Sequence, residues 1–253
     1  APMHDSMKSP DLQEQIRNAM RNLFSPLKGE ERHLRFVFLT GISKFSQLSI
    51  FSELNNITNI SMLDKYSDIC GISRNELVSI FKADIRELAN ENEMTYDEAL
   101  SELQHHYDGY HFSGRGEDVY NPYSLFNTLA SNEFDDYWFS TGTPTFLIDL
   151  LQEKHLDMLD LDDITATADR FDTPTEKIID PVPVLYQSGY LTIKAYNRRS
   201  KIFKLGFPNT EVKTGFSNSL FRYYAPDNLG EKDALYAAYY ECLVEHDDME
   251  AFI

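Results

Sequence analysis

Apolar residues follow a helical spacing near the start of the chain and a strand-like pattern directly after it. The predicted helix begins at Ser9-Pro10, a cap with proline in the first helical position, and ends at Lys28-Gly29. The next apolar run, Leu34 to Leu39, contains β-branched and aromatic residues and predicts a buried parallel strand that ends at Thr40-Gly41. A helix followed by a strand is typical of an α/β unit. The apolar positions of the helix are Leu12, Ile16, Met20, Leu23 and Leu27.

Most of the pattern between residues 61 and 155 is helical. Two capping boxes, Ser73 to Glu76 and Thr95 to Glu98, each precede an amphipathic run. Asn121-Pro122 and Thr143-Pro144 predict two further helix starts, because each pairs a capping residue with a proline in the first turn. The sequence therefore predicts a helical subdomain over this region.

The pattern changes again after residue 155. Residues 156–172 are rich in aspartate and are interpreted as an exposed connection or a weak helix. Val182 to Ser188 predicts a short helix closed by Gly189, and Pro208-Asn209 predicts the start of a helix that runs toward Tyr224. Between them, Tyr190 to Asn197 and Lys201 to Gly206 predict a β-hairpin. Helix, hairpin and helix in this order suggest a winged-helix-type module.

The net charge of −18 over 253 residues predicts a strongly acidic surface. Such a surface repels phosphate backbones, which argues against non-specific binding of nucleic acid. No apolar run approaches the roughly 20 residues of a membrane span, and no signal-peptide pattern opens the chain, so we expect a cytoplasmic protein without a membrane partner. Cys70 and Cys242 lack a paired spacing, which argues against a disulfide framework or a Cys-ligated zinc site.

A phosphate-binding loop of the GxxxxGK[ST] type is absent, because no glycine of the chain is followed by lysine. Three other motifs could carry chemistry, and a structural interpretation is favoured for each. Glu211-Val212-Lys213 has the ExK form of a nuclease half-site, but Asn209 predicts a helix cap before it. Asp160 to Asp163 lacks the glycine and distal glutamate of an EF-hand. His105 to His111 could bind metal or transfer protons, whereas the structural alternative is an Asp108-Gly109 turn between packed aromatic residues.

Seven strings along the chain resemble, in the same order, the bacterial family of AAA-ATPase-like proteins. Members of that family usually join a P-loop ATPase module to a C-terminal PD-(D/E)XK nuclease-like domain. The resemblance covers nearly the whole chain and is therefore more specific than any single motif. The strings are Leu34 to Ser46, Ile50 to Asn56, Tyr107 to Phe112, Val119 to Leu125, Tyr137 to Leu147, Tyr186 to Lys194 and Leu205 to Asn209.

The resemblance implies an α/β remnant of a P-loop ATPase core, then a mainly α-helical lid and a winged-helix-like module, predominantly α overall. Residues 1–60 would be the C-terminal part of the core, 61–155 the helical lid, 156–226 an acidic linker with the wing, and 227–253 the start of a helical connection to a further domain. We expect the chain to be an internal fragment that lacks both Walker motifs and is inactive as an ATPase alone. ATP and Mg²⁺ are implied for the parent, with no cofactor bound by the fragment.

In related ATPases a polar sensor of the γ-phosphate follows the core strand, and Thr40 and Ser43 fall at that place. Their alternative roles are a turn after the strand and a cap of the next helix. Arg35 is interpreted as a surface or interface residue rather than an arginine finger.

The implied function is a nucleotide-dependent switch that controls an attached nuclease-like domain. The alternative is a protein-interaction or DNA-binding wing without ATPase activity, centred on Arg198, Arg199 and Lys201, with Lys194 and Lys204 nearby. Five charges in an acidic chain favour a protein partner, or the parent's own P-loop segment and C-terminal domain, over DNA.

Overall fold

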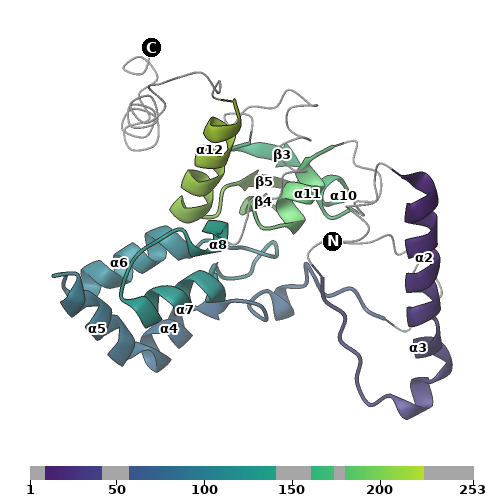
Figure 1. Ribbon diagram of the computed structural model, residues 1–253, viewed down its shortest axis with the longest axis horizontal. Helices are drawn as coiled ribbons and strands as arrows, with labels where there is room; N and C mark the ends of the chain where they lie inside the picture. The colour runs from purple at the N-terminus through teal and green to yellow at the C-terminus, as the bar shows by residue number, and fades with distance from the viewer. Residues whose placement is uncertain (1–8, 42–56, 141–160, 174–179, 225–253) are drawn as a thin grey trace.

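A computed structural model describes residues 9–41, 57–140, 161–173 and 180–224. Figure 1 shows a helical unit at one end, a sheet unit beside it, and a long N-terminal helix at the opposite side. One hydrophobic core lies within the helical unit, and a second is centred on the sheet unit but also includes Val119, with Trp138 and Phe139 packed against it. The helix predicted from Thr143-Pro144 and the residue Cys242 lie outside the described residues, and Cys70 is a free, exposed thiol.

The N-terminal helix forms as predicted but is interrupted near its end. It comprises α2 (Pro10–Phe24) and the short α3 (Pro26–Gly29), followed by the 3-10 turn η1 (Glu31–His33). Pro26 explains the interruption, because proline has no backbone N–H and its ring crowds the preceding turn. Ser9 occupies the N-cap with extended backbone angles, although its side chain makes no capping hydrogen bond.

The buried strand predicted at Leu34 to Leu39 does not form in this structure. The segment has neither helix nor strand geometry, and its apolar side chains are exposed, Phe36 by 80% and Phe38 by 48%. The rings of these two phenylalanines stack on each other with centroids 6.4 Å apart. A strand that is apolar on both faces is stable only between neighbouring strands and covering helices, and no strand of the described part pairs with it.

The helical unit contains the helices that the capping signals predict. Both capping boxes are formed, at Ser73 and at Thr95, and Asn121 caps the next helix start by accepting the backbone N–H of Tyr123 at 3.0 Å. The elements are η2 (Asp64–Tyr66), β1 (Ile72–Ser73), α4 (Arg74–Ile80), α5 (Lys82–Glu91), α6 (Tyr96–Tyr107), β2 (Val119–Tyr120), α7 (Pro122–Ser131) and α8 (Tyr137–Ser140). β1 and β2 form a short antiparallel pair. The buried core includes Leu77, Ile85, Leu88, Leu103, Tyr107, Tyr120 and Leu125.

The sheet unit confirms the predicted helix, hairpin and helix, and adds a strand that was not predicted. Its elements are β3 (Ile164–Ala166), α10 (Ala168–Phe171), α11 (Val182–Gln187), β4 (Thr192–Asn197), β5 (Ile202–Gly206) and α12 (Thr210–Tyr224). All pairings in the sheet are antiparallel, and its strand order is β3-β5-β4. The core includes Leu161, Phe171, Leu185, Tyr190, Leu205 and Phe216.

Over residues 156–172 the sequence predicts an exposed connection or a weak helix, and the described part contains the short helix α10 but also the strand β3, which contradicts an exposed connection. Ile164 and Ala166 are buried while Thr165 between them is exposed, which is the period of two expected for a strand with one covered face. The exposed aspartates on either side conceal this short alternation in the sequence. Within the described part of the chain, no helix combines the length and the apolar character needed to cross a membrane.

Candidate functional site at the junction of the two units

The segment that leaves α6 joins the helical unit to the sheet unit. Asp108 follows the last residue of α6 and is buried, and its carboxylate accepts the backbone N–H of Gly109 at 2.8 Å. Burial raises the pKa of Asp108, and the Gly109 N–H and the charge of Arg74 act in the opposite direction. Asn209 reaches the same turn from the start of α12, where its amide donates to the Asp108 carbonyl at 2.9 Å. Its amide oxygen accepts the Val212 N–H at 3.1 Å, so Asn209 is the helix cap that the sequence predicts.

Gly109 allows this turn to approach the sheet unit closely. Its φ is +92°, and a Cβ at this position would lie 2.3 Å from the carbonyl oxygen of Pro208. The same carbonyl accepts a hydrogen bond from Nζ of Lys194 on β4 at 3.0 Å. The turn therefore requires glycine for two reasons, its left-handed backbone and the space it leaves.

His111 and Thr192 form a second connection between the units. The backbone N–H of His111 donates to the Thr192 hydroxyl at 2.7 Å, and that hydroxyl donates to the His111 carbonyl at 3.1 Å. Nδ1 of the His111 ring lies 2.8 Å from Oδ1 of Asp118, and this contact lowers the pKa of the Asp118 carboxyl. These residues contact backbone and neighbouring side chains of the junction, as the structural interpretation of His105 to His111 expects.

Glu211 makes the third connection, from the first turn of α12. The ExK motif thus lies on a helix whose cap is Asn209, as the structural interpretation of that motif expects. The side chain of Glu211 is fully buried, and its oxygens accept hydrogen bonds from the Ser124 hydroxyl on α7 and the Trp138 N–H on α8, each at 2.8 Å. Burial raises its pKa to about 7. Sequence reasoning missed this burial, because an acid in the first turn of a helix is usually exposed.

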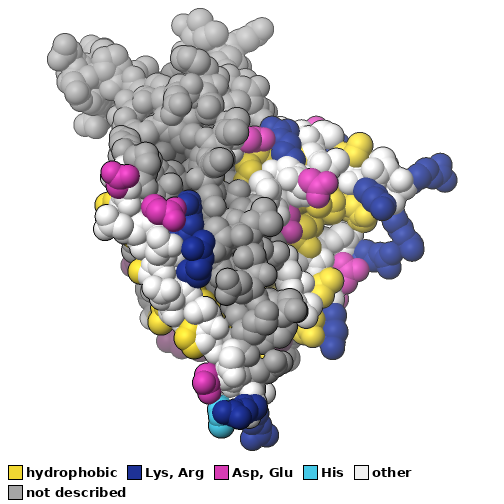
Figure 2. Space-filling model, turned by 90° about the vertical axis from the view of Figure 1, so that its right-hand side faces the viewer, with side chains coloured by type: hydrophobic (Ala, Val, Ile, Leu, Met, Phe, Trp, Pro, Cys, Tyr) yellow, Lys and Arg dark blue, Asp and Glu magenta, His cyan; other side chains and the backbone are white. Residues whose placement is uncertain are grey.

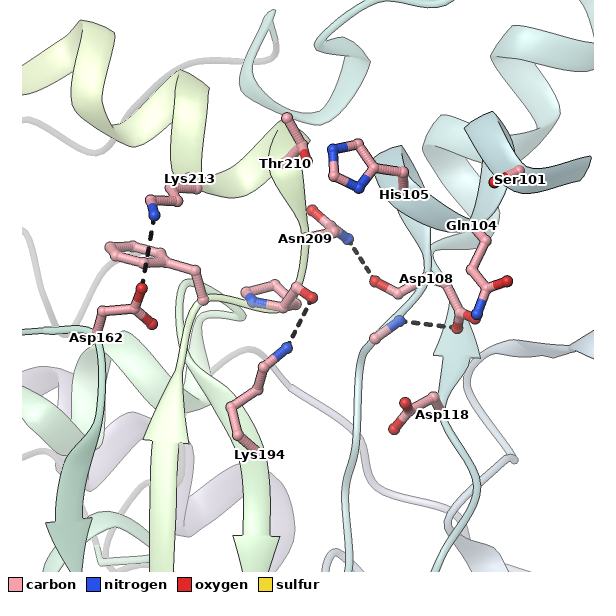
Figure 3. Close-up of a pocket in the computed structure, with 13 residues that line it drawn as sticks. Ser101, Gln104, His105, Asp108, Asp118, Asp162, Lys194, Asn209, Thr210 and Lys213 are labelled. Atoms are coloured by element: carbon pink, nitrogen blue, oxygen red, sulfur yellow. Dashed lines mark hydrogen bonds and ion pairs between the residues drawn. The ribbon is translucent and has the colours of Figure 1, made fainter. Parts of the chain in front are cut away.

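A cavity of about 530 Å³ opens beside the connection between Asp108 and Asn209 (Figure 3). Its wall mixes both signs of charge, with Lys194 and Lys213 near Asp108, Asp118 and Asp162. Both lysines already have partners, because Lys194 donates to the Pro208 carbonyl and Lys213 lies 3.6 Å from Asp162. Among the described residues, no group of three or more His, Cys, Asp or Glu side chains is arranged to hold a metal ion.

Residues of the three motifs that the sequence interprets as structural meet at this cavity, because His105, Asp108, Asp162 and Lys213 all line it. The sensor candidate Thr40 is not among the lining residues. Thr40 lies in the exposed segment after Leu39, and Ser43 lies outside the described residues. Arg35 is exposed, as a surface residue would be. Of the predicted acidic turn, Asp162 and Asp163 are exposed, and Asp163 pairs with Lys204 at 2.7 Å.

Arg198, Arg199 and Lys201 are exposed in the β4–β5 turn, at the end of the hairpin away from Thr192. Asn197 holds the turn by accepting the backbone N–H groups of Arg199 and Ser200 at 3.0 and 3.1 Å. Figure 2 shows several Lys and Arg side chains at the right-hand edge of the molecule, with others at the left and at the bottom. No ion pair with a described residue involves the three basic residues of the turn.

Comparison with known proteins supports the expected family over the N-terminal segment. The model of the AAA-ATPase-like family, which is described as a predicted AAA-ATPase, matches residues 1–51. A protein of Azotobacter chroococcum mcd 1, named as the uncharacterized protein in the vnfD 5′ region, is 35% identical over 228 residues, which are 89% of this chain and 42% of the relative. The chain thus spans less than half the length of that relative. No solved structure matches the chain.

Proposed function

We propose that this chain supplies the lid and wing of a nucleotide-dependent switch in an AAA-ATPase-like protein. In this proposal ATP and Mg²⁺ bind to a core completed by residues outside the chain, and the switch controls an attached nuclease-like domain. The observation that carries the proposal is the exposed apolar run at Leu34 to Leu39, which lies within the segment matched by the family.

The run has the composition of a strand from the interior of a parallel sheet. Phe36, Val37, Phe38 and Leu39 are all exposed by more than a third. Burying one such side chain stabilises a protein by roughly 1.5–3 kcal/mol, so insertion between neighbouring strands would be strongly favoured. Ligands of open α/β sheets bind beyond the carboxyl ends of the strands, and Thr40 follows that end directly. This placement supports a sensor role for Thr40.

Lid and wing meet through both apolar and polar contacts, and the proposed switch would act on these contacts. The core of the sheet unit includes Val119 of β2, and Trp138 and Phe139 of α8 pack against it. The two units are also joined by polar connections at Asn209, at Thr192 and at Glu211. Polar contacts can be exchanged for water at small net cost, whereas the shared apolar contacts hold the units together.

The sheet unit also supports the winged-helix proposal while arguing against DNA as its ligand. The chain order β3, α10, α11, β4, β5 with the sheet order β3-β5-β4 is the arrangement expected of such a module. The helix that would enter a DNA groove is α11, but Val182 to Leu185 are buried and the helix contains no Lys or Arg. The basic turn at Arg198, Arg199 and Lys201 is therefore assigned to a protein partner or to another domain of the parent.

The test compares amide hydrogen exchange in this chain and in a protein extended to the length of the curated relative. We expect the amides of residues 34–40 to exchange rapidly in the short chain and slowly in the longer protein. Mg-ATP should change exchange at His111, whose N–H donates to Thr192, only in the longer protein. The cores of α5 and α6 serve as internal controls. If the amides of residues 34–40 exchanged at the same rate in both proteins, the placement of this run in the ATPase core would be refuted. If Mg-ATP did not change the exchange rate at His111 in the longer protein, the proposed switch would be refuted.

A further inference from the structure

Glu211 joins three helices with one buried carboxylate. The residue belongs to α12 of the sheet unit, while its hydrogen-bond donors Ser124 and Trp138 belong to α7 and α8 of the helical unit. Ser124 is itself fully buried. Separation of the two units would therefore expose Glu211 to water, and docking removes it from water completely.

No cation among the described residues compensates the buried charge. Lys213, on the same helix, pairs instead with Asp162. His106 of α6 lowers the pKa of Asp136. The titratable groups that face Glu211 are either acidic or phenolic: Tyr107 of α6, Tyr110 of the segment after α6, and Asp135 and Asp136 before α8. Two donors and several acidic neighbours are poor compensation for a desolvated carboxylate.

We propose that Glu211 is a proton-sensitive latch, at which docking of the sheet unit onto the helical unit takes up a proton near neutral pH. Neutral Glu211 can keep its oxygen as an acceptor for the Trp138 N–H and share a hydrogen bond with the Ser124 hydroxyl. The ionised form must remain buried without a counter-ion. Mild acid therefore closes the junction, and alkaline pH loosens it.

The direction follows from the pKa of Glu211 in the two states. In the docked state burial raises it from 4.5 to about 7, and in water it returns toward the ordinary value. The stabilisation of docking is complete below the lower pKa and is lost as pH rises through the higher one. Between pH 5 and pH 8 the docking equilibrium should weaken on the order of a hundredfold.

The chain carries its own reporter of this junction. Trp138 is the single tryptophan of the sequence. Its backbone N–H donates to Glu211, and its ring lies 5.0 Å from that of Tyr190 in the sheet unit, between centroids. Tryptophan fluorescence of the 253-residue chain, recorded from pH 5 to pH 8.5, therefore reads the state of the latch directly.

We expect a transition near pH 7 in the natural chain and its loss in Glu211→Gln, which keeps the shape of the side chain without a titrating group. Glu87→Gln, on the exposed surface of α5, is the matched control and should retain the transition. Ser124→Ala removes one donor to the carboxylate and should move the midpoint to higher pH, which a purely structural contact would not do.

A flat fluorescence profile in the natural chain would overturn the latch. So would a transition that persists in Glu211→Gln, because it would then belong to a histidine of the junction. If Glu211→Gln fails to fold, as judged by far-UV circular dichroism, the test rests on the Ser124→Ala variant and on the midpoint pH of its fluorescence transition. An unshifted midpoint in that variant would equally overturn the proposal.

Discussion

Gly109→Ala is the sharpest perturbation of the junction, because it adds one methyl group at the closest approach of the two units. The glycine has a φ of +92°, a conformation that side chains rarely adopt. The new Cβ would lie 2.3 Å from the Pro208 carbonyl oxygen, which is backbone and cannot rotate away. Either the turn or the segment before α12 must move.

The magnitude follows from two contributions. A left-handed backbone costs a residue with a side chain about 1–2 kcal/mol. Displacement of the Pro208 carbonyl weakens its hydrogen bond from Lys194, and a bond with a charged donor contributes about 1.5–3 kcal/mol. Reduced freedom of the unfolded chain offsets about 0.4–1 kcal/mol of this. We therefore expect a loss of about 2–4 kcal/mol in the free energy of unfolding.

Urea denaturation followed by circular dichroism measures this loss, provided that the m-value is unchanged. Gly29→Ala is the matched control, because Gly29 has no atom within 4 Å of an added Cβ and no left-handed backbone. The control should be as stable as the natural chain or about 1 kcal/mol more stable, since alanine favours helix. If Gly109→Ala stayed within about 0.5 kcal/mol of the natural chain, the assignment of Gly109 to the junction would be refuted.

Three further variants test other parts of the account. Asn209→Ala loses a helix cap and a second side-chain hydrogen bond, so chemical denaturation should show a loss of about 1–2 kcal/mol; an unchanged midpoint would contradict the cap. Arg198→Ala/Arg199→Ala should leave duplex DNA binding undetectable, as in the natural chain, in anisotropy titrations at about 0.15 M salt; sub-micromolar binding that the variant loses would favour a DNA-binding wing. Ser73→Ala should cost about 1 kcal/mol at neutral pH. The backbone N–H and the hydroxyl of Ser73 lower the pKa of Glu76, and the variant loses only the hydroxyl. The difference should therefore shrink as acid protonates Glu76, while the part due to the capped Glu76 N–H remains; a difference that grows below about pH 3 would contradict this.

The sequence predicted correctly the helix starts that are fixed by hydrogen bonds between residues close together in the chain. The boxes at Ser73 and Thr95 satisfy backbone donors within four residues, so their sequence alone specifies the helix start. Asn209 acts in the same way for α12. The Asp108-Gly109 turn was expected because Asp-Gly favours turns, and the structure forms it with a φ of +92° at Gly109.

The sequence did not predict the strand β3 or the burial of Glu211, because both depend on contacts between residues far apart in the chain. The short strand Ile164–Ala166 exists because β5 offers it a partner about 40 residues away. Glu211 is buried because α7 and α8 close over the start of α12, and no neighbour in sequence announces this. At Leu34 to Leu39 the sequence predicts a strand that the structure does not contain. The pattern is that of a buried strand, but no described strand pairs with the segment.

Calorimetry with Mg-ATP tests the central claim most directly, on this chain and on a protein extended to the length of the curated relative. The short chain lacks a glycine-lysine phosphate loop, so it should give no saturable heat. The longer protein should bind with an affinity near micromolar, roughly 8 kcal/mol of binding free energy. Saturable binding by the short chain, or none by the longer protein, would contradict the assignment of this chain to the lid and wing of a nucleotide-dependent switch.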